Sequence, residues 1–278
     1  MDEQTDSTVL DAARAGDARA LEMLLERHQA QVYRFGLKMC RDPEDAKDVL
    51  QDTLLAMARS VRDFRGASSI STWLYTIARS FCIKKRRRST FAPARAPRSL
   101  DTDAATEARR LADPARSPDD VMLDKEIARA LDDAIGALDP IYREVLILRD
   151  VEGLTAPEVA EVLGVTVDAI KSRLHRARLE VRGRVAPVLG IAAEADGMKR
   201  NSCPDIMLNF SRYLEDEISA NVCGEMERHI ATCDRCRDAC ESLKRSLALC
   251  RSTPSVQVPS ETQRAVRVAV REYLSGRS

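Results

Sequence analysis

The chain has 278 residues, with 44 basic and 44 acidic side chains and 44% hydrophobic residues. This length is enough for two or three domains, each with its own core. No apolar run approaches the roughly 18–20 residues that cross a bilayer, and the acidic beginning is no signal peptide, so we exclude a membrane protein and expect a cytoplasmic one. Apolar residues recur at helical spacing without alternating β-type runs, which predicts an all-α protein.

The first predicted domain covers residues 8–90. One of its helices begins at Asp42–Asp45, where a capping Asp, a first-turn Pro and acids at the positive end of the helix dipole coincide. A polar loop at 62–69 precedes a helix over Ser71–Arg88, which carries Trp73 and Phe81 and ends in five consecutive bases. Aromatic rings beside a run of bases are typical of surfaces that bind single-stranded nucleic acid. The alternative is that the rings pack in the core and the bases are solvated.

Two segments are predicted to be linkers. Residues 91–120 are rich in Pro and Ala and have no periodic apolar face, which favours a flexible connection. Residues 186–200, which contain Pro187, Gly190 and Gly197, form a second, shorter candidate.

The domain predicted at 121–185 contains a helix-turn-helix. Thr155 and Glu158 form a capping box, Gly164 suits a left-handed helix end, and Thr166 can cap a second helix. One face of that second helix is apolar, and the other carries Lys171, Arg173, Arg176 and Arg178, with no acid between residues 169 and 179. A merely solvated helix would normally mix charge signs, whereas charge of one sign suits insertion between DNA phosphates. We therefore expect the second helix to read DNA.

Six of the eight cysteines follow residue 200. In the domain predicted at 201–252, Cys203, His229, Cys233 and Cys236 make a complete set of ligands for a closed Cys₃His zinc site. Buried or incidental thiols are the alternative, but small apolar cysteines would not have charged neighbours on both sides. An amphipathic helix is predicted at 260–275.

Three further cysteines of the tail, Cys223, Cys240 and Cys250, lie outside this ligand set. Oxidation could link a zinc ligand to one of them and expel the metal. They could equally be packed as small hydrophobes, or bind a thiophilic metal ion directly. These three alternatives stay open at the level of sequence.

Residues 42–54 and 71–79 resemble conserved region 2 of the extracytoplasmic-function (ECF) sigma factors, and residues 139–178 resemble their region 4. The resemblance implies binding to core RNA polymerase, through its β′ clamp and β flap, and to promoter DNA. It assigns the β′ clamp contact to Asp48, Gln51 and Asp52. It assigns the −10 element to Phe64, Ser68, Trp73, Tyr75, Arg79, Ser80 and Lys84, and the −35 element to Lys171, Ser172, Arg173, Arg176 and Arg178. Ser80 departs from the Asn usual in the family, which puts the −10 sequence preference in doubt.

The spacing from Cys203 to Cys236 resembles the zinc-associated anti-sigma domain. This implies a tail that masks the sigma regions of its own chain. We therefore expect an ECF sigma factor for stress-responsive transcription, autoinhibited by a zinc-binding tail that responds to a redox or metal signal. The alternative is a helix-turn-helix repressor independent of polymerase with a metal-sensing tail, but a repressor has no need of the first domain. No enzyme is expected, because we find no phosphate-binding Gly loop and no nucleophile near His28 or His175.

Overall fold

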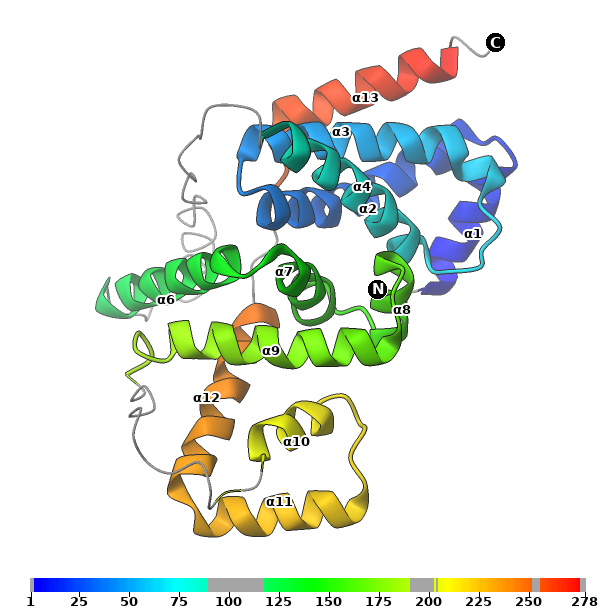
Figure 1. Ribbon diagram of the computed structural model, residues 1–278. Helices are drawn as coiled ribbons and strands as arrows, with labels where there is room; N and C mark the ends of the chain where they lie inside the picture. The colour runs from blue at the N-terminus through cyan, green and yellow to red at the C-terminus, as the bar shows by residue number, and fades with distance from the viewer. Residues whose placement is uncertain (1–2, 90–117, 191–202, 204, 252–255, 276–278) are drawn as a thin grey trace. The chain divides into compact units, whose positions relative to one another are not determined.

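The computed structural model describes residues 3–89, 118–190, 203, 205–251 and 256–275 (Figure 1). Every element of regular secondary structure within these ranges is helical, which confirms the all-α prediction. Residues 90–117 and 191–202, where most of the two predicted linkers falls, lie outside the described residues. The boundaries of the predicted domains therefore stay predictions. In the described part of the chain, no helix is both long and apolar enough to cross a membrane.

The helices form two compact units, and the first unit contains the N-terminal helices. Its elements are α1 (Glu3–Arg14), α2 (Ala18–Cys40), α3 (Pro43–Ser60), the 3₁₀ turn η1 (Val61–Asp63), α4 (Ile70–Ser89), the last three residues of α8 and α13 (Ser260–Ser275). Helices α2, α3 and α4 pack against one another around buried Leu and Val side chains. At the crossing of α2 and α3, a Cβ added to Gly36 would lie 3.3 Å from the Cα of Ala46, so only glycine fits without a shift.

The starts of α2 and α3 follow local sequence signals. Asp17 and Asp42 cap the two helices, each accepting backbone N–H bonds from the first turn. Arg41, between α2 and α3, is in the left-handed region with φ 58° and donates its N–H to the Leu37 carbonyl. The prediction of a helix start at Asp42 is confirmed.

The second unit contains the predicted helix-turn-helix and the cysteine-rich helices. Its elements are α6 (Pro118–Ala137), α7 (Pro140–Leu146), the π-helical turn η2 (Ile147–Val151), α8 (Ala156–Leu163) except for its last three residues, α9 (Val167–Val185), α10 (Ile206–Tyr213), α11 (Ala220–Thr232) and α12 (Asp234–Arg251). Helix α9 packs against α6 and α7, which precede it in the chain, and against α10 and α12, which follow it.

The residues predicted to start and end the helices of the helix-turn-helix do so in the structure. The backbone N–H of Thr155 donates to the Glu158 carboxylate at 2.8 Å, and the N–H of Glu158 donates back to the Thr155 hydroxyl at 3.4 Å. Gly164 ends α8 with φ +66°, a conformation that a side chain would strain. The Thr166 hydroxyl accepts the N–H of Ala169 at 3.2 Å and so caps α9.

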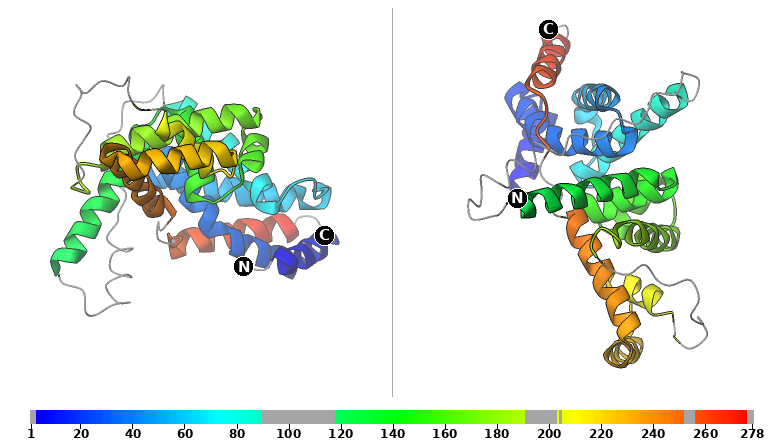
Figure 2. Two further views of the ribbon diagram at one scale, coloured as in Figure 1. Left: turned by 90° about the horizontal axis from the view of Figure 1, so that it is seen from below. Right: turned by 90° about the vertical axis from the view of Figure 1, so that its left-hand side faces the viewer.

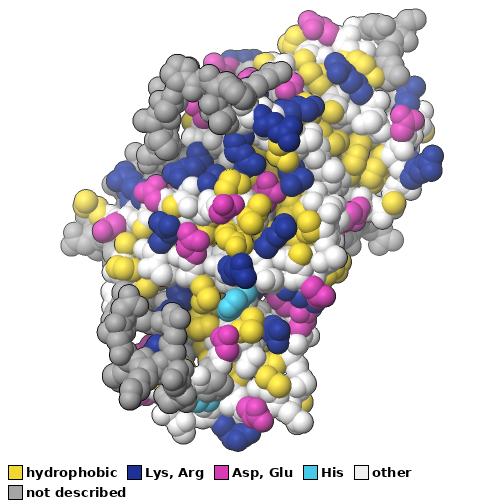
Figure 3. Space-filling model, in the orientation of Figure 1, with side chains coloured by type: hydrophobic (Ala, Val, Ile, Leu, Met, Phe, Trp, Pro, Cys, Tyr) yellow, Lys and Arg dark blue, Asp and Glu magenta, His cyan; other side chains and the backbone are white. Residues whose placement is uncertain are grey.

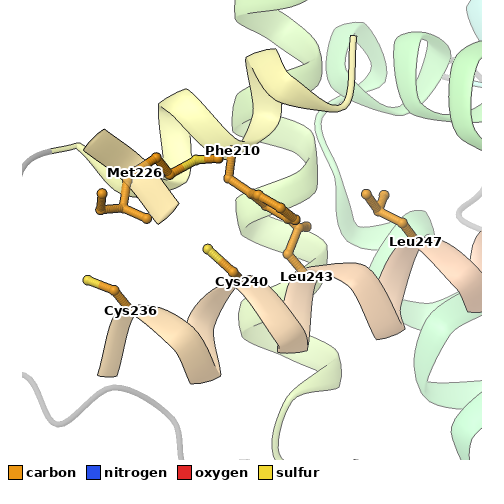
Figure 4. Packing of buried hydrophobic residues seen from close by; sticks show 7 residues of the cluster. Phe210, Met226, Cys236, Cys240, Leu243 and Leu247 are labelled. Atoms are coloured by element: carbon orange, nitrogen blue, oxygen red, sulfur yellow. The ribbon is translucent and has the colours of Figure 1, made fainter. Parts of the chain in front are cut away.

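A small apolar core holds α10, α11 and α12 together (Figure 4). Phe210 comes from α10 and Met226 from α11, while Cys236, Cys240 and Leu243 lie along α12. The C-terminal helix α13 is a separate element. It packs on α3 in the first unit and runs beside the N-terminal helices (Figure 2), although the sequence had placed it with the zinc-binding domain.

Candidate metal centre and DNA-reading surface

The four predicted metal ligands come together at one end of the α10–α12 core. The donor atoms of Cys203, His229, Cys233 and Cys236 all lie within 4.8 Å of one another. His229 lies in the last turn of α11, Cys233 is the residue that ends this helix, and Cys236 lies in the first turn of α12. Tetrahedral zinc with ligand bonds of about 2.0–2.3 Å needs donor separations of this order.

The chemistry of this group also suits a cation. Burial, together with the neighbouring Cys233 and Cys203 thiols, raises the pKa of Cys236 to about 12. The Nε2 atom of His229 lies 3.2 Å from the Cys236 sulfur. Three thiols this close resist joint ionisation unless a divalent cation compensates the charge. The residues present therefore fit a Cys₃His zinc ion.

The remaining tail cysteines differ in exposure and reactivity. Cys240 and Cys250 are buried, and burial raises the pKa of Cys240 to about 11. Cys223 is partly exposed, and desolvation and then the nearby Glu227 raise its pKa as well. A protonated thiol is a poor nucleophile, so the raised pKa values disfavour oxidation of Cys223 and Cys240. Their predicted redox role remains an untested hypothesis.

Arg178, predicted to contact the −35 element, is only 1% exposed. Its guanidinium donates two bonds to the Asp150 carboxylate, from Nε at 2.9 Å and from Nη2 at 2.7 Å. The Nη2 atom also donates to Glu215, at 2.7 Å, in the turn that follows α10. Burial opposes the charge, but these bonds outweigh it and raise the pKa of Arg178 above its ordinary value. Arg178 thus pairs with buried acids in this structure, and its predicted contact with the −35 element stays a prediction.

The physical reason is its position along α9. Arg178 lies four residues after buried Leu174 and three before buried Val181, so it belongs to the apolar stripe rather than to the basic face. A charged side chain is tolerated at this apolar position because the carboxylates of Asp150 and Glu215 pair with the Arg178 guanidinium.

Glu215 is the centre of a contact between the tail and α9. Its carboxylate is 5% exposed and accepts a second bond, from the Nε of Arg149 at 2.8 Å. Two residues further on, Glu217 forms an ion pair with Lys171, a residue predicted to read the −35 element. Acidic side chains of the tail therefore pair with bases on and beside the predicted DNA-reading helix.

Other predicted −35 residues lie along a cleft between α9 and the tail. This cleft has a volume of about 600 Å³ and is lined on the α9 side by Lys171, Ser172, His175 and Arg176. Asp205, Arg212, Glu215 and Glu217 of the tail line its other side. Ser172 and Arg176 are exposed and Arg173 is half-buried, and Arg176 donates to the Tyr142 hydroxyl at 3.2 Å. The DNA contacts of these residues stay predictions.

The predicted −10 residues divide into buried and accessible groups. Tyr75 is 2% exposed and packs on Phe35, with the ring centroids 5.4 Å apart. Phe64 is also buried, and its ring stacks on that of Trp73 at 4.6 Å. Tyr75 and Phe64 therefore pack in the core in this structure, and their predicted contact with the −10 element stays a prediction.

The accessible −10 residues are spread over α4 and the loop before it. Ser68, Trp73 and Arg79 are half-buried, whereas Ser80 and Lys84 are exposed. The Ser80 hydroxyl donates to the Ile77 carbonyl of its own helix at 2.7 Å, and the Lys84 ammonium lies 4.9 Å from the Phe81 ring centroid. DNA contact by these five residues remains a prediction.

The predicted polymerase-binding residues lie on α3. Asp48 and Asp52 are exposed and Gln51 is half-buried. Asp48 forms an ion pair with Lys85 of α4, a partner that the sequence did not indicate. On the neighbouring face of α3, Lys47 lies 3.8 Å from Glu261 of α13. Acidic and basic side chains are interspersed over the face shown in Figure 3, in keeping with the net charge of zero.

Sequence reasoning missed Asp150 and Glu215. Asp150 lies within residues 139–178 but was assigned no role there, and Glu215 meets Arg178 across 37 residues of sequence. The available signal was indirect, because an Arg on the apolar stripe of a helix needs a buried acid to pair with.

Three family profiles match the chain. They are Sigma-70 region 2 over residues 24–91, Sigma-70, region 4 over residues 128–181, and the family described as "Putative zinc-finger" over residues 203–237. The ECF RNA polymerase sigma-E factor of Haemophilus influenzae is 29% identical over 189 residues, which cover 66% of this chain and 97% of that protein. The ECF RNA polymerase sigma factor SigE of Mycolicibacterium smegmatis is 30% identical over 189 residues, which cover 66% of this chain and 69% of that protein.

The chain belongs to the ECF sigma factors. In this sigma factor, region 2 spans most of α2, together with α3 and α4, and region 4 contains the helix-turn-helix of α8 and α9. The zinc-finger match contains all four residues of the Cys₃His group, which fits zinc binding by the tail. A solved structure of CnrH in complex with the cytosolic domain of CnrY is 26% identical, with a TM-score of 0.45, and covers 68% of this chain and 99% of that chain.

Proposed function

We propose that this ECF sigma factor directs core RNA polymerase in the cytoplasm to its promoters and that its own zinc-binding tail holds it inactive. Region 2 would open the −10 element and region 4 would read the −35 element. The tail would bind one zinc ion through Cys203, His229, Cys233 and Cys236. The observation that supports autoinhibition most directly is that Glu215 of the tail accepts hydrogen bonds from two arginines of region 4, Arg149 and Arg178.

The tail occludes the DNA-reading face of α9 through charge and volume. The ion pair between Glu217 and Lys171 occupies a base that would otherwise meet a phosphate. Asp205, Arg212 and Glu217 of the tail line the same cleft as Ser172 and Arg176, so the tail lies where a DNA backbone would have to approach these residues. DNA binding by region 4 therefore requires that α10 and the turn after it leave α9.

Helix α13 supports the same conclusion for region 2. Arg267 and Arg271 of α13 form ion pairs with Glu26 and Glu22 of α2, at 2.9 and 3.3 Å. The Tyr273 ring faces the Arg59 guanidinium, with the Cζ atom 5.7 Å from the ring centroid. A helix seated here adds bulk beside the predicted polymerase face at Asp48 and Gln51. Access of the polymerase clamp to α3 would then depend on the release of α13.

The test is transcription in vitro with core polymerase, comparing the full chain with a chain that ends after Gly190. This end point keeps both sigma regions and Ala186, the buried residue that ends α9. We expect on the order of tenfold more transcript from the shortened chain, because a tethered inhibitor acts at an effective concentration near millimolar. Equal transcription from both chains would refute autoinhibition. Transcription from neither would instead favour a repressor independent of polymerase.

A matched pair of variants locates the effect. Glu215→Gln removes the charge that faces Arg149 and Arg178, and it should raise transcription towards the level of the shortened chain. Asp216→Asn removes the same charge from the exposed neighbouring residue and should leave transcription unchanged. A rise with both variants would point to bulk electrostatics rather than to the Glu215 contact.

A further inference from the structure

Cys40 and Cys82 are the only cysteines before residue 200, and their sulfur atoms lie 3.5 Å apart. They are separated by 42 residues of sequence. Cys40 is the last residue of α2, at the corner that leads into α3, and Cys82 lies in α4. Both lie in the first unit, well away in sequence from the zinc ligands. We propose that this pair is an oxidation site of region 2, which forms a disulfide on reaction with a hydroperoxide.

The packing of α4 on the α2–α3 corner brings the two thiols together. Cys82 and Lys85 are three residues apart and so share one face of α4. Lys85 forms an ion pair with Asp48 and lies 3.6 Å from Asp45, both at the start of α3. These ion pairs and the packing of α2 on α4 hold Cys82 against Cys40. A disulfide needs a sulfur separation of about 2.0 Å, so closing the bond requires the two sulfur atoms to approach each other by about 1.5 Å.

The two thiols differ in exposure, and this assigns their roles. Cys40 is half-buried and Cys82 is 5% exposed. The Cys40 sulfur attacks the O–O bond of the hydroperoxide and forms a sulfenic acid, and an alcohol, or water from hydrogen peroxide, leaves. The Cys82 sulfur then displaces the hydroxyl from the Cys40 sulfur as water, and the S–S bond forms. Two thiols are oxidised by two electrons, and one hydroperoxide is reduced.

The disulfide would tie the end of α2 to α4, the helix that carries the exposed Ser80 and Lys84. Closing a loop of 42 residues restricts the unfolded chain strongly. Oxidation should therefore stabilise region 2 and leave the zinc-binding tail unchanged. This proposal is independent of autoinhibition, because no contact of the tail enters it.

The experiment treats the full-length, zinc-loaded protein with one equivalent of hydrogen peroxide, blocks free thiols with an alkylating agent and digests with trypsin. Cleavage after basic residues places Cys40 in the peptide Met39–Arg41 and Cys82 in the peptide Ser80–Lys84. We expect these peptides joined, two hydrogen masses below their sum and separable by dithiothreitol, at least tenfold more abundantly than any linked peptide from the tail. The melting temperature of region 2 should rise by roughly 10 °C or more.

Two variants test the assigned roles. Cys40→Ser at the helix end should abolish the linked peptide and the thermal shift. Cys82→Ser should leave Cys40 to accumulate as a sulfenic acid that dimedone traps. If the buried Cys82→Ser protein fails to fold, Cys40→Ser and the wild-type peptide map alone decide the question.

Some outcomes overturn the proposal. One is that both peptides carry the alkylating agent at a peroxide dose that oxidises the tail. Another is a Cys40 sulfinic acid with Cys82 still reduced in the wild-type protein. A third is a linked peptide found only in covalent dimers on a non-reducing gel.

Discussion

At the scale of single residues, Arg178 has a sequence context that predicts DNA binding and a structural context that indicates a buried ion pair. Its sequence neighbourhood is that of a DNA-binding helix, yet its side chain is buried between Asp150 and Glu215. A guanidinium in this position is costly to remove, because a buried acid would be left without its partner.

We expect Arg178→Met to lower the free energy of unfolding by about 3–5 kcal/mol, since Asp150 would be left buried and unpaired. The exposed Arg176→Met is the matched control and should change it by less than ~0.5 kcal/mol. Urea denaturation followed by circular dichroism measures both. Similar values for the two variants would contradict a structural role for Arg178.

His175 gives a prediction about pH. Burial lowers the pKa of His175 below its ordinary value of 6.5, with Asp205 opposing the effect and Arg178, Arg212 and Arg176 adding to it. The unfolded chain therefore takes up a proton near pH 6.5 that the folded chain does not, so this contribution to stability is present above pH 6.5 and is lost as the pH falls below it.

Between pH 7.5 and 5.5 we expect the unfolding free energy of the wild-type protein to fall more steeply than that of His175→Gln. Parallel urea titrations at several pH values give the difference, in which the contributions of other groups cancel. Identical slopes would show that His175 titrates alike in both states.

At the scale of elements, the helix starts could be predicted because their causes are local. Asp42, Thr155 and Thr166 act on backbone groups within three residues, and Gly164 needs only its own φ. The Cys₃His set was equally readable from spacing. The partners of Arg178, the meeting of Cys40 with Cys82, and the seat of α13 on α3 depend on tertiary packing, which no short pattern encodes. The same packing buries Tyr75, which was predicted to face DNA.

The seat of α13 can be tested with two valines of the same helix. Val270 is 1% exposed, whereas Val268, two residues earlier, is 55% exposed. Val270→Asp would bury a charge without a partner and should release α13 from α2 and α3. Limited proteolysis should then cut α13 at least several times faster than in the wild-type protein. Val268→Asp should be cut at the wild-type rate, and equal cutting of both variants would count against the observed seat.

At the scale of the whole molecule, the metal is expected to decide whether the tail folds. The apolar core of α10, α11 and α12 is small, and structural zinc sites of this kind contribute on the order of 10 kcal/mol to folding. Removing zinc with a chelator should therefore unfold these helices and raise transcription towards, but not up to, the level of the chain that ends after Gly190, because α13 still packs on α3.

Zinc content measured beside helicity tests this. Cys236→Ser should bind less than one zinc ion per chain and show the same loss of helicity, while Cys250→Ser, outside the ligand set, should retain both. Full zinc content in Cys236→Ser would refute the assigned ligands. Full helicity after complete removal of the metal would show that the tail folds without it.

The tail contacts its own chain through two separate pieces. Helices α10 and α12 lie on α9 in the second unit, and α13 lies on α3 in the first. Only residues 252–259 separate α12 from α13, so each piece keeps the other at a high local concentration near its binding site. An inhibitor built in this way is bivalent. Under the proposed autoinhibition, release of one piece would leave the other bound, and the released piece would rebind because the short connection keeps it at a high local concentration. We therefore expect a brief signal to have no effect on transcription and a signal that outlasts rebinding to start it.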